Sequence, residues 1–251
     1  MVFPFSIFRV MVLTWIGIAV IVFFILLRIR APYGRHTTTD WGPLVDNHIG
    51  WLIMESPALA IMLYVFISCF HCNVVAAMAG LFCLHYINRT FIFPFRLRTP
   101  GKKIPWVIVL SAIFFNSVNT SFLAMDFTWF SSYPDDYFTD PRFILGVIMF
   151  FSGMAINWWA DNKLIHLRKP GETGYKIPEG GLFKYISCPN LFGELIEWSG
   201  FAILCWNLST LGFLVWTIAN LLPRALAHHE WYKEKFNEYP ADRKAVLPYL
   251  L

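Results

Sequence analysis

Charged residues are scarce in this chain. Lys, Arg, Asp and Glu together make up 14% of its 251 residues, whereas 57% are hydrophobic and 18% are aromatic. Because a soluble domain usually carries about 25% charged residues, the composition argues against a soluble protein. It predicts one helical domain over 1–251, embedded as a multi-pass protein in a bacterial inner membrane or in the endoplasmic reticulum.

Signatures of several common function classes are also missing. The chain has no G-x-G-x-x-G after a strand and no G-x-x-x-x-G-K-[ST], which excludes a Rossmann domain and a P-loop. No basic cluster alternates with exposed aromatics, so we expect no nucleic-acid partner. Cys69 and Cys72 have no second pair at zinc-finger spacing, and adjacent His228 and His229 would point about 100° apart on a helix. We therefore expect no metal site, and we expect the five cysteines to be buried free thiols.

Long apolar runs recur along the chain and predict an all-α membrane protein with about seven transmembrane helices. A helix needs about 20 apolar residues to cross a hydrocarbon core of about 30 Å. The first run is too long for a signal peptide and no small-residue cleavage site follows it. The predicted spans are 5–27, 51–70, 74–95, 105–125, 143–164, a helix capped by Ser187 and ending near 205, and 210–222, which could continue past Pro223.

Lysine and arginine are distributed unevenly between the segments that join these spans. All 20 of them except three fall in 28–47, 96–104, 163–187 and 224–251, whereas the loop 126–141 carries four aspartates. Basic residues collect on the cytoplasmic side of a membrane protein. The sequence therefore predicts an N-terminus outside and a C-terminus in the cytoplasm.

The stretch 167–198 is unusual in such an apolar chain. Its first half is a basic loop in which glycine and proline prevent a long helix or strand. In its second half Asn190, Glu194 and Glu197 follow at i, i+4 and i+7, so they share one face of a helix. We interpret this stretch as half of a ligand site. The alternative is that the two glutamates pair with Lys184 or Arg224 near the surface.

Ionisable residues also occur inside the predicted spans, where they are costly and usually functional. Glu55 lies in the second span, and Tyr86 and Arg89 lie one helical turn apart in the third. These residues predict a second, deeper part of the site. The alternative is that Glu55 and Arg89 form an ion pair that only holds two helices together.

A third group of polar residues follows the last span. Arg224, His228 and Tyr232 are spaced at i, i+4 and i+8, so they form one stripe on a helix. An Arg–His–Tyr stripe suits a phosphate and an adenine or ribose. The combined pattern predicts an anionic cofactor on the cytoplasmic side and a lipophilic substrate that enters from the bilayer.

The motifs around this site resemble those of the steroid 5α-reductase family. The resemblance covers the chain from about Trp51 to the end and is most specific between Arg168 and Trp198. It rests on Leu167 to Glu172, Tyr175, Ile177-Pro178, Gly180 to Phe183, Asn190, Gly193-Glu194, Glu197-Trp198, His85-Tyr86, Arg89 to Phe91, and the ending Tyr239-Pro240 and Arg243 to Ala245.

The resemblance implies a seven-helix membrane enzyme that uses NADPH to reduce the 4,5 double bond of a 3-oxo-Δ4-steroid. Glu55 and Tyr86 would hold the steroid carbonyl, and Trp51 and Met54 would contact the substrate. Two features depart from the family: Met54 stands where mammalian members carry Gln, and the loop 96–103, with Arg98, matches poorly. The implied cofactor residues are Arg89, Asn157, Asp161, Arg168, Tyr175, Asn190, Glu194, Arg224, His228 and Tyr232.

Other functions remain open at this point. The same scaffold could reduce another lipid double bond, in a sterol ring, a polyprenol or an enoyl-CoA, or could be a methyltransferase that uses S-adenosylmethionine. Arg168 and Lys169 favour a phosphorylated cofactor over S-adenosylmethionine. A transporter or lipid-binding scaffold would need polar groups along the whole path across the bilayer, whereas the polar groups of this sequence cluster toward the cytoplasmic half. We expect a monomer whose partners are the steroid-like substrate and membrane lipid.

Overall fold

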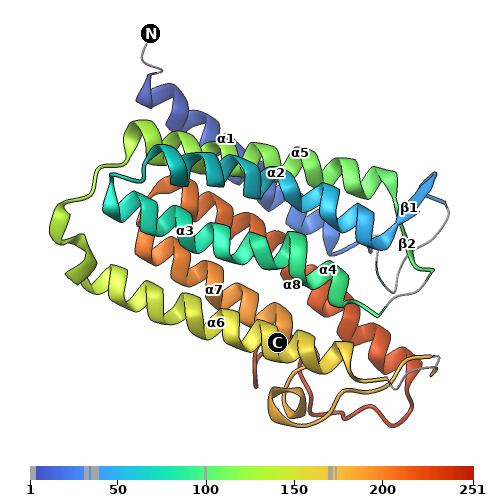
Figure 1. The fold of residues 1–251 in the computed structure, drawn as a ribbon. Helices are drawn as coiled ribbons and strands as arrows, with labels where there is room; N and C mark the ends of the chain where they lie inside the picture. Colours follow the sequence, from blue (N-terminus) through green and yellow to red (C-terminus); the bar gives the residue numbers. More distant parts are fainter. Residues whose placement is uncertain (1–3, 31–33, 35–39, 99–100, 169–171, 173) are drawn as a thin grey trace.

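Long helices lie side by side in the computed structural model, which describes the chain except residues 1–3, 31–33, 35–39, 99–100, 169–171 and 173 (Figure 1). Successive long helices run in opposite directions along one axis (Figure 1). The α-helices are α1 Phe5–Leu26, α2 Asn47–Ser68, α3 Asn73–Ile87, α4 Phe93–Arg96, α5 Trp106–Met125, α6 Pro141–Ile165, α7 Pro189–Cys205 and α8 Leu208–Lys235. Single turns of π-helix (Asn88–Ile92, Asp126–Phe130) and 3₁₀-helix (Asp135–Thr139, Gly181–Lys184) adjoin or connect them.

Within the described part of the chain, six helical segments are long and apolar enough to cross a membrane: Phe5–Leu26, Asn47–Ser68, Asn73–Arg96, Trp106–Phe130, Pro141–Ile165 and Leu208–Lys235. Their outer faces carry exposed apolar side chains such as Ile21, Tyr64 and Phe114, which are 62%, 71% and 63% exposed and suit contact with lipid. The prediction of an all-α membrane protein is confirmed. The remaining predicted span, α7, has 17 residues and at 1.5 Å per residue is shorter than a hydrocarbon core of about 30 Å.

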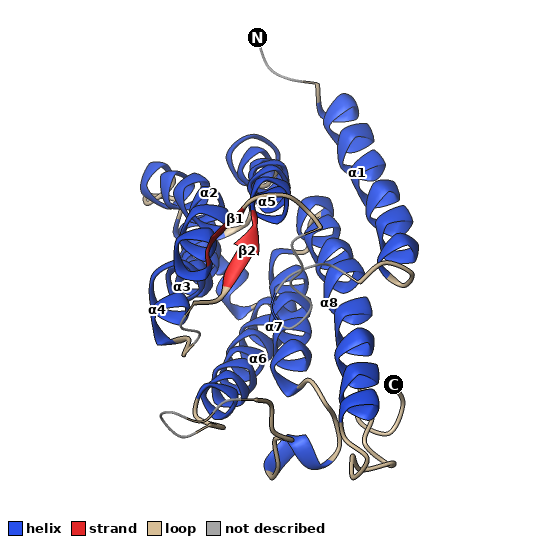
Figure 2. Ribbon diagram, turned by 90° about the vertical axis from the view of Figure 1, so that its right-hand side faces the viewer, coloured by secondary structure: helices blue, strands red, loops and turns tan. Residues whose placement is uncertain are grey.

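The structure adds one element to the predicted helices. The strands β1 Leu44–Asp46 and β2 Lys103–Pro105 pair in an antiparallel ladder, with Val45 opposite Ile104. Figure 2 shows this small sheet at one end of the helices, with α1 against α8 and away from α2, α3 and α4. The last helix does continue past Pro223, to Lys235.

Two local predictions were wrong. Ser187 does not cap α7; Cys188 occupies the N-cap position, and Ser187 Oγ instead lies 2.7 Å from His229 Nδ1 and 2.6 Å from the Tyr239 hydroxyl. The cause is the C-terminal segment, because Ser187 also donates through both N and Oγ to the Lys244 carbonyl. All five cysteines are free, but only three are buried: Cys69, at the end of α2, is half-buried, and Cys72, in the turn between α2 and α3, is exposed.

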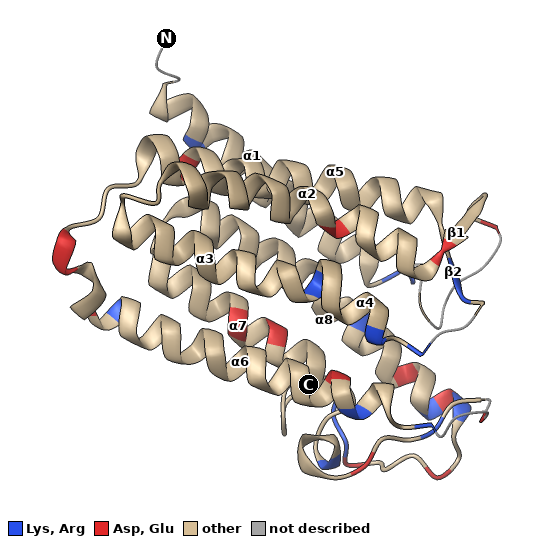
Figure 3. Ribbon diagram, viewed as in Figure 1, with Lys and Arg blue, Asp and Glu red and all other residues tan. Residues whose placement is uncertain are grey.

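Charge separates the two ends of the molecule. Lys and Arg gather at the end that carries the strands and the C-terminal segment, while the acidic 3₁₀ turn Asp135–Thr139, in the connection from α5 to α6, lies at the opposite end (Figure 3). Helix α1 also begins at this opposite end (Figure 1). The distribution agrees with the predicted orientation, in which the basic end is cytoplasmic.

Helices α6 and α7 pack with their backbones in contact. A Cβ atom added at Gly153 would lie 2.3 Å from the backbone N of Glu197, and one at Gly193 would lie 2.5 Å from that of Asn157. Gly146 and Gly200 meet in the same way, about two helical turns away from the contact of Gly153 with α7. Small residues at such positions let membrane helices approach closely. This contact brings the polar side chains of the two helices together at the site described below.

We expect Gly153→Ala to destabilise the protein by at least about 3 kcal/mol, the upper end of the cost of overpacking. The added methyl group would strike backbone, which cannot rotate away as a side chain does. The measurement is the thermal unfolding midpoint in detergent. Gly17→Ala in α1 is the matched control, because a Cβ at Gly17 has no neighbour within 4 Å. Equal midpoints for the two variants would contradict the close packing.

Candidate active site

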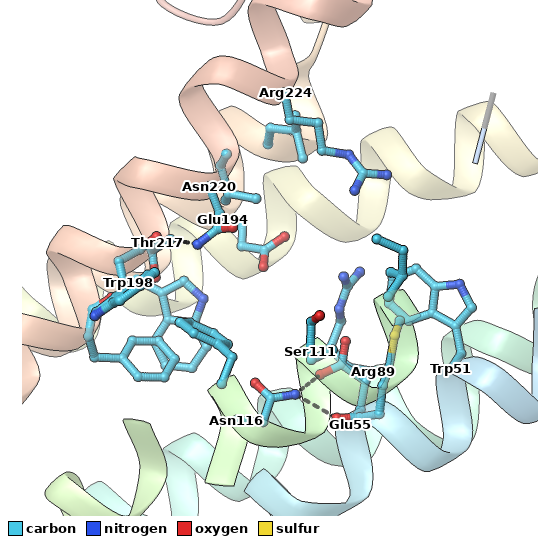
Figure 4. Close-up of a pocket in the computed structure, with 18 of the residues that line it drawn as sticks. Trp51, Glu55, Arg89, Ser111, Asn116, Glu194, Trp198, Thr217, Asn220 and Arg224 are labelled. Atoms are coloured by element: carbon cyan, nitrogen blue, oxygen red, sulfur yellow. Dashed lines mark hydrogen bonds between the residues drawn. The ribbon is translucent and has the colours of Figure 1, made fainter. Parts of the chain in front are cut away.

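A cavity of about 640 Å³ lies between the helices near the basic end. Its walls come from α1, α2, α3, α5, α6, α7 and α8. In Figure 4, Glu194 and Arg224 point into it from one side, and Glu55 and Arg89 point into it from the other. The cavity therefore joins the deep polar group and the cytoplasmic polar group that the sequence predicted separately.

Glu55 is positioned by an interruption in α2. Pro57 has no N–H, so the Ile53 carbonyl lacks its usual helical donor, and Ser56 Oγ donates to that carbonyl at 3.0 Å. Asn116 in α5 donates through Nδ2 to the Met54 carbonyl at 2.7 Å and to Glu55 Oε2 at 3.2 Å (Figure 4). Asn116 thus holds the Glu55 carboxyl at the cavity wall through one of the two carboxyl oxygens.

Tyr86 and Arg89 reach the cavity from the end of α3 and the π-helical turn after it. The Tyr86 ring is buried and stacks on Phe82 at a centroid distance of 4.6 Å. The Arg89 guanidinium carbon lies 4.7 Å from the ring centroid of Trp51 and 5.0 Å from that of Phe93. Among the described residues no ion pair joins Arg89 to Glu55. No direct contact therefore supports the alternative that Glu55 and Arg89 form an ion pair that only holds two helices together.

The face of α7 that the sequence singled out divides between two environments. Asn190 and Glu194 line the cavity, and Asn190 Nδ2 donates to Asp161 Oδ1 at 3.0 Å. Asn157 supports this arrangement from α6, because its Nδ2 donates to the Asn190 carbonyl at 3.0 Å. Glu197 is buried and lies 2.7 Å from His85 Nδ1. The alternative that Glu197 pairs with Lys184 or Arg224 near the surface was wrong.

Other predicted residues fall into two groups. Trp51, Met54, Asp161, Arg224 and His228 line the cavity together with Arg89, Asn190 and Glu194. Arg168, Tyr175 and Tyr232 are not among the residues that line it, so their contacts with a cofactor stay predictions, as does that of Asn157. Lys169 lies outside the described residues.

The loop residues of the second group lie near the tip of α8. Arg168 donates to the Gly174 carbonyl at 3.1 Å, and Tyr175 packs against Trp231 at a centroid distance of 4.8 Å. Tyr232 stacks on Tyr239 at 5.3 Å. The contact of Tyr175 with Trp231 thus joins the described part of this loop to α8.

Several cavity residues were not predicted. Asn116 could have been found, because an amide within an apolar run is as unusual as a carboxylate there. The His85–Glu197 contact joins residues 112 positions apart, and nothing in the sequence pairs them. Trp15 and Val22 of α1 line the cavity as ordinary apolar residues, which carry no sequence signal of a site.

Comparison with known proteins gives one consistent family. The family model for 3-oxo-5-alpha-steroid 4-dehydrogenase matches residues 102–251. A steroid 5-alpha-reductase of Gossypium hirsutum is 40% identical over 255 residues, which cover 98% of each chain. One of Arabidopsis thaliana is 42% identical over 234 residues and 88% of each chain. The human 3-oxo-5-alpha-steroid 4-dehydrogenase 1 is 40% identical over 225 residues, 88% of this chain and 86% of the human one. These matches, over nearly the whole length of a chain with membrane helices, show that it belongs to the steroid 5α-reductase family of oxidoreductases that act on a carbon–carbon double bond.

Proposed function

We propose that the protein reduces the 4,5 double bond of a 3-oxo-Δ4-steroid with NADPH as the reductant. The observation that carries this proposal is one cavity lined both by Glu55 and Tyr86 and by Asn190, Glu194 and Arg224; in Figure 4, Glu55 lies across it from Glu194 and Arg224. The first group suits a carbonyl oxygen, and the second suits a polar, phosphorylated cofactor. Curated relatives with the names of steroid reductases support the substrate class.

The cavity has the charged and polar groups that a dinucleotide requires. Arg89 and Arg224 supply guanidinium groups for phosphates. Asp161, Asn190 and Glu194 supply carboxylate and amide groups for ribose hydroxyls and the nicotinamide amide. When bound, NADPH would supply the hydride. The residues present therefore fit the cofactor.

Glu55 and Tyr86 would activate the substrate. Hydride addition to the β carbon of an enone moves negative charge onto the carbonyl oxygen, and donors placed against that oxygen stabilise the charge as it develops. The Tyr86 hydroxyl is one donor. A charged carboxylate is costly in an apolar site, so we propose that Glu55 carries a proton and is the second donor. Asn116, bonded to Oε2 of Glu55, would hold the carboxyl in position.

The substrate would reach these donors from the lipid. Phe114 lines the cavity and is also 63% exposed on the outer face of α5, and Ile18 of α1 lines it and is 40% exposed. A cavity of about 640 Å³ is within the range of sites for drug-sized ligands, about 300–1,000 Å³. Its apolar walls include Trp51, Met54 and residues of α1, which suit a steroid ring system.

We expect a preference for NADPH over NADH that depends on Arg168. A guanidinium can bind the additional phosphate of NADPH through two parallel hydrogen bonds to two charged oxygens, an arrangement that the neutral ribose hydroxyl of NADH cannot match. Arg168→Ala should raise the Michaelis constant for NADPH at least about 10-fold, the loss of one charge-assisted hydrogen bond. Lys176→Ala is the control, because it removes another cation of the same loop, one paired with Glu172. Equal use of NADH by the unmutated protein would refute the assignment.

A further inference from the structure

A buried histidine–glutamate pair lies beside the donors proposed for the carbonyl and has no part in the function proposed so far. His85 Nδ1 and Glu197 Oε1 are 2.7 Å apart, and the two side chains are 5% and 1% exposed. The contact joins α3, which carries Tyr86, to α7, which carries Glu194. Ionisable groups withdrawn so far from water inside a membrane protein are costly, and they commonly belong to proton pathways.

Glu197 holds the imidazole in one orientation. The contact with Glu197 Oε1 occupies Nδ1 of His85. The other carboxylate oxygen, Glu197 Oε2, has no hydrogen-bond partner among the described residues, so His85 is the group that balances the charge of the carboxylate. The imidazole ring packs edge-on against Trp198 and Tyr86, with centroid distances of 4.6 Å and 5.2 Å. His85 lines the cavity. A carboxylate behind an oriented imidazole is the arrangement that hydrolases use to transfer protons.

Reduction of an enone needs a proton as well as a hydride. When hydride bonds to the β carbon, the electron pair of the double bond moves to the α carbon and the carbonyl oxygen. The α carbon must then accept a proton, whereas the donors Tyr86 and Glu55 act at the oxygen. Because the α carbon is two bonds from that oxygen, its proton donor must lie beside Tyr86. His85 is the ionisable cavity residue next to Tyr86 in the chain and in ring contact with it.

We propose that the imidazolium of His85, oriented and balanced in charge by Glu197, delivers the proton to the α carbon; this rests on the reductase function proposed above. The N–H bond at Nε2 breaks and a C–H bond forms, while the enolate electrons restore the carbonyl double bond. His85 is left as a neutral imidazole with Nδ1–H donating to Glu197, and it regains its proton from water. Glu197 is a positioning residue, since it acts through His85.

The test is the stereochemistry of the product formed in D₂O with unlabelled NADPH. The solvent then supplies the deuterium on the α carbon, and a fixed donor places it on one face of the steroid. His85→Gln should lower the rate of product formation about 10²-fold, the lower end for a general acid, and give a mixture of both faces. Glu197→Gln keeps the size of the side chain and removes its charge, and it should show the same loss of stereochemistry. A mixture arises because an enol released into water is protonated from either side.

Binding and folding are measured on the same variants. NADPH titration and the thermal unfolding midpoint should stay near those of the unmutated protein, and His166→Gln, an exposed histidine at the end of α6, should change nothing. If both variants place deuterium on one face at the unmutated rate, the proposal is overturned while the reductase function stands. If the unmutated protein does not reduce the enone at all, the reductase function fails and this proposal fails with it.

Discussion

Replacing Tyr86 with phenylalanine should lower turnover about 10²–10³-fold, as removal of an oxyanion donor does in other enzymes, with little change in stability. The substitution keeps the aromatic ring, which stacks on Phe82, and removes only the hydroxyl. Charge develops on the carbonyl oxygen during the reaction rather than on binding, so the Michaelis constant for the steroid should change much less than turnover. The measurement is single-turnover oxidation of bound NADPH, followed by absorbance.

The variants to compare with Tyr86→Phe lie in α2, which packs against α3. Tyr64→Phe removes a hydroxyl that is 71% exposed on the outer face of α2, and it should have no effect. Glu55→Gln keeps the size and a donor, so it should be milder than Glu55→Leu. Reduction at the unmutated rate by Tyr86→Phe would leave Tyr86 as one more packed aromatic residue.

Replacing Glu194 with alanine should weaken NADPH binding about 10- to 100-fold, the loss of a hydrogen bond to a charged group. Glu194 points into the cavity opposite Glu55, and it stands one turn after Asn190 on α7 (Figure 4). Retention of the cofactor through purification in detergent should be lost, while the protein stays folded and inserted in the membrane. Fluorescence titration with NADPH gives the dissociation constant.

Glu230→Ala is the matched control for Glu194, because Glu230 pairs with Lys233 on the exposed surface of α8. It should bind NADPH as the unmutated protein does. Full NADPH binding by Glu194→Ala would show that Glu194 has no part in holding the cofactor.

The apolar runs predicted most of this fold because a membrane span leaves so few alternatives for the backbone. They could not predict the β1–β2 ladder, since three residues per strand give no periodicity to detect. They also gave no sign that Gly153 and Gly193 bring α6 and α7 into backbone contact, because single glycines in apolar runs have many roles.

The sequence predicted the site residues that share one helix, but not the contacts between side chains of different helices. Asn190 and Glu194 stand out from an apolar helix, and helical spacing correctly places them together on one face. The same spacing placed Glu197 with them, yet Glu197 is two turns from Asn190, about 10 Å along the axis, where it meets His85 of α3. A partner in another helix depends on packing, which the sequence of one helix does not contain.

In the function proposed above, hydride passes within this cavity from a bound nicotinamide to a steroid double bond. The most direct test mixes the purified, unmutated protein, loaded with NADPH that carries deuterium on the transferred position, with one equivalent of a 3-oxo-Δ4-steroid. Mass spectrometry and nuclear magnetic resonance then locate the label. The account predicts one steroid reduced for each NADPH oxidised, with deuterium at C5. Bound NADPH that stays reduced in the presence of the steroid would contradict it.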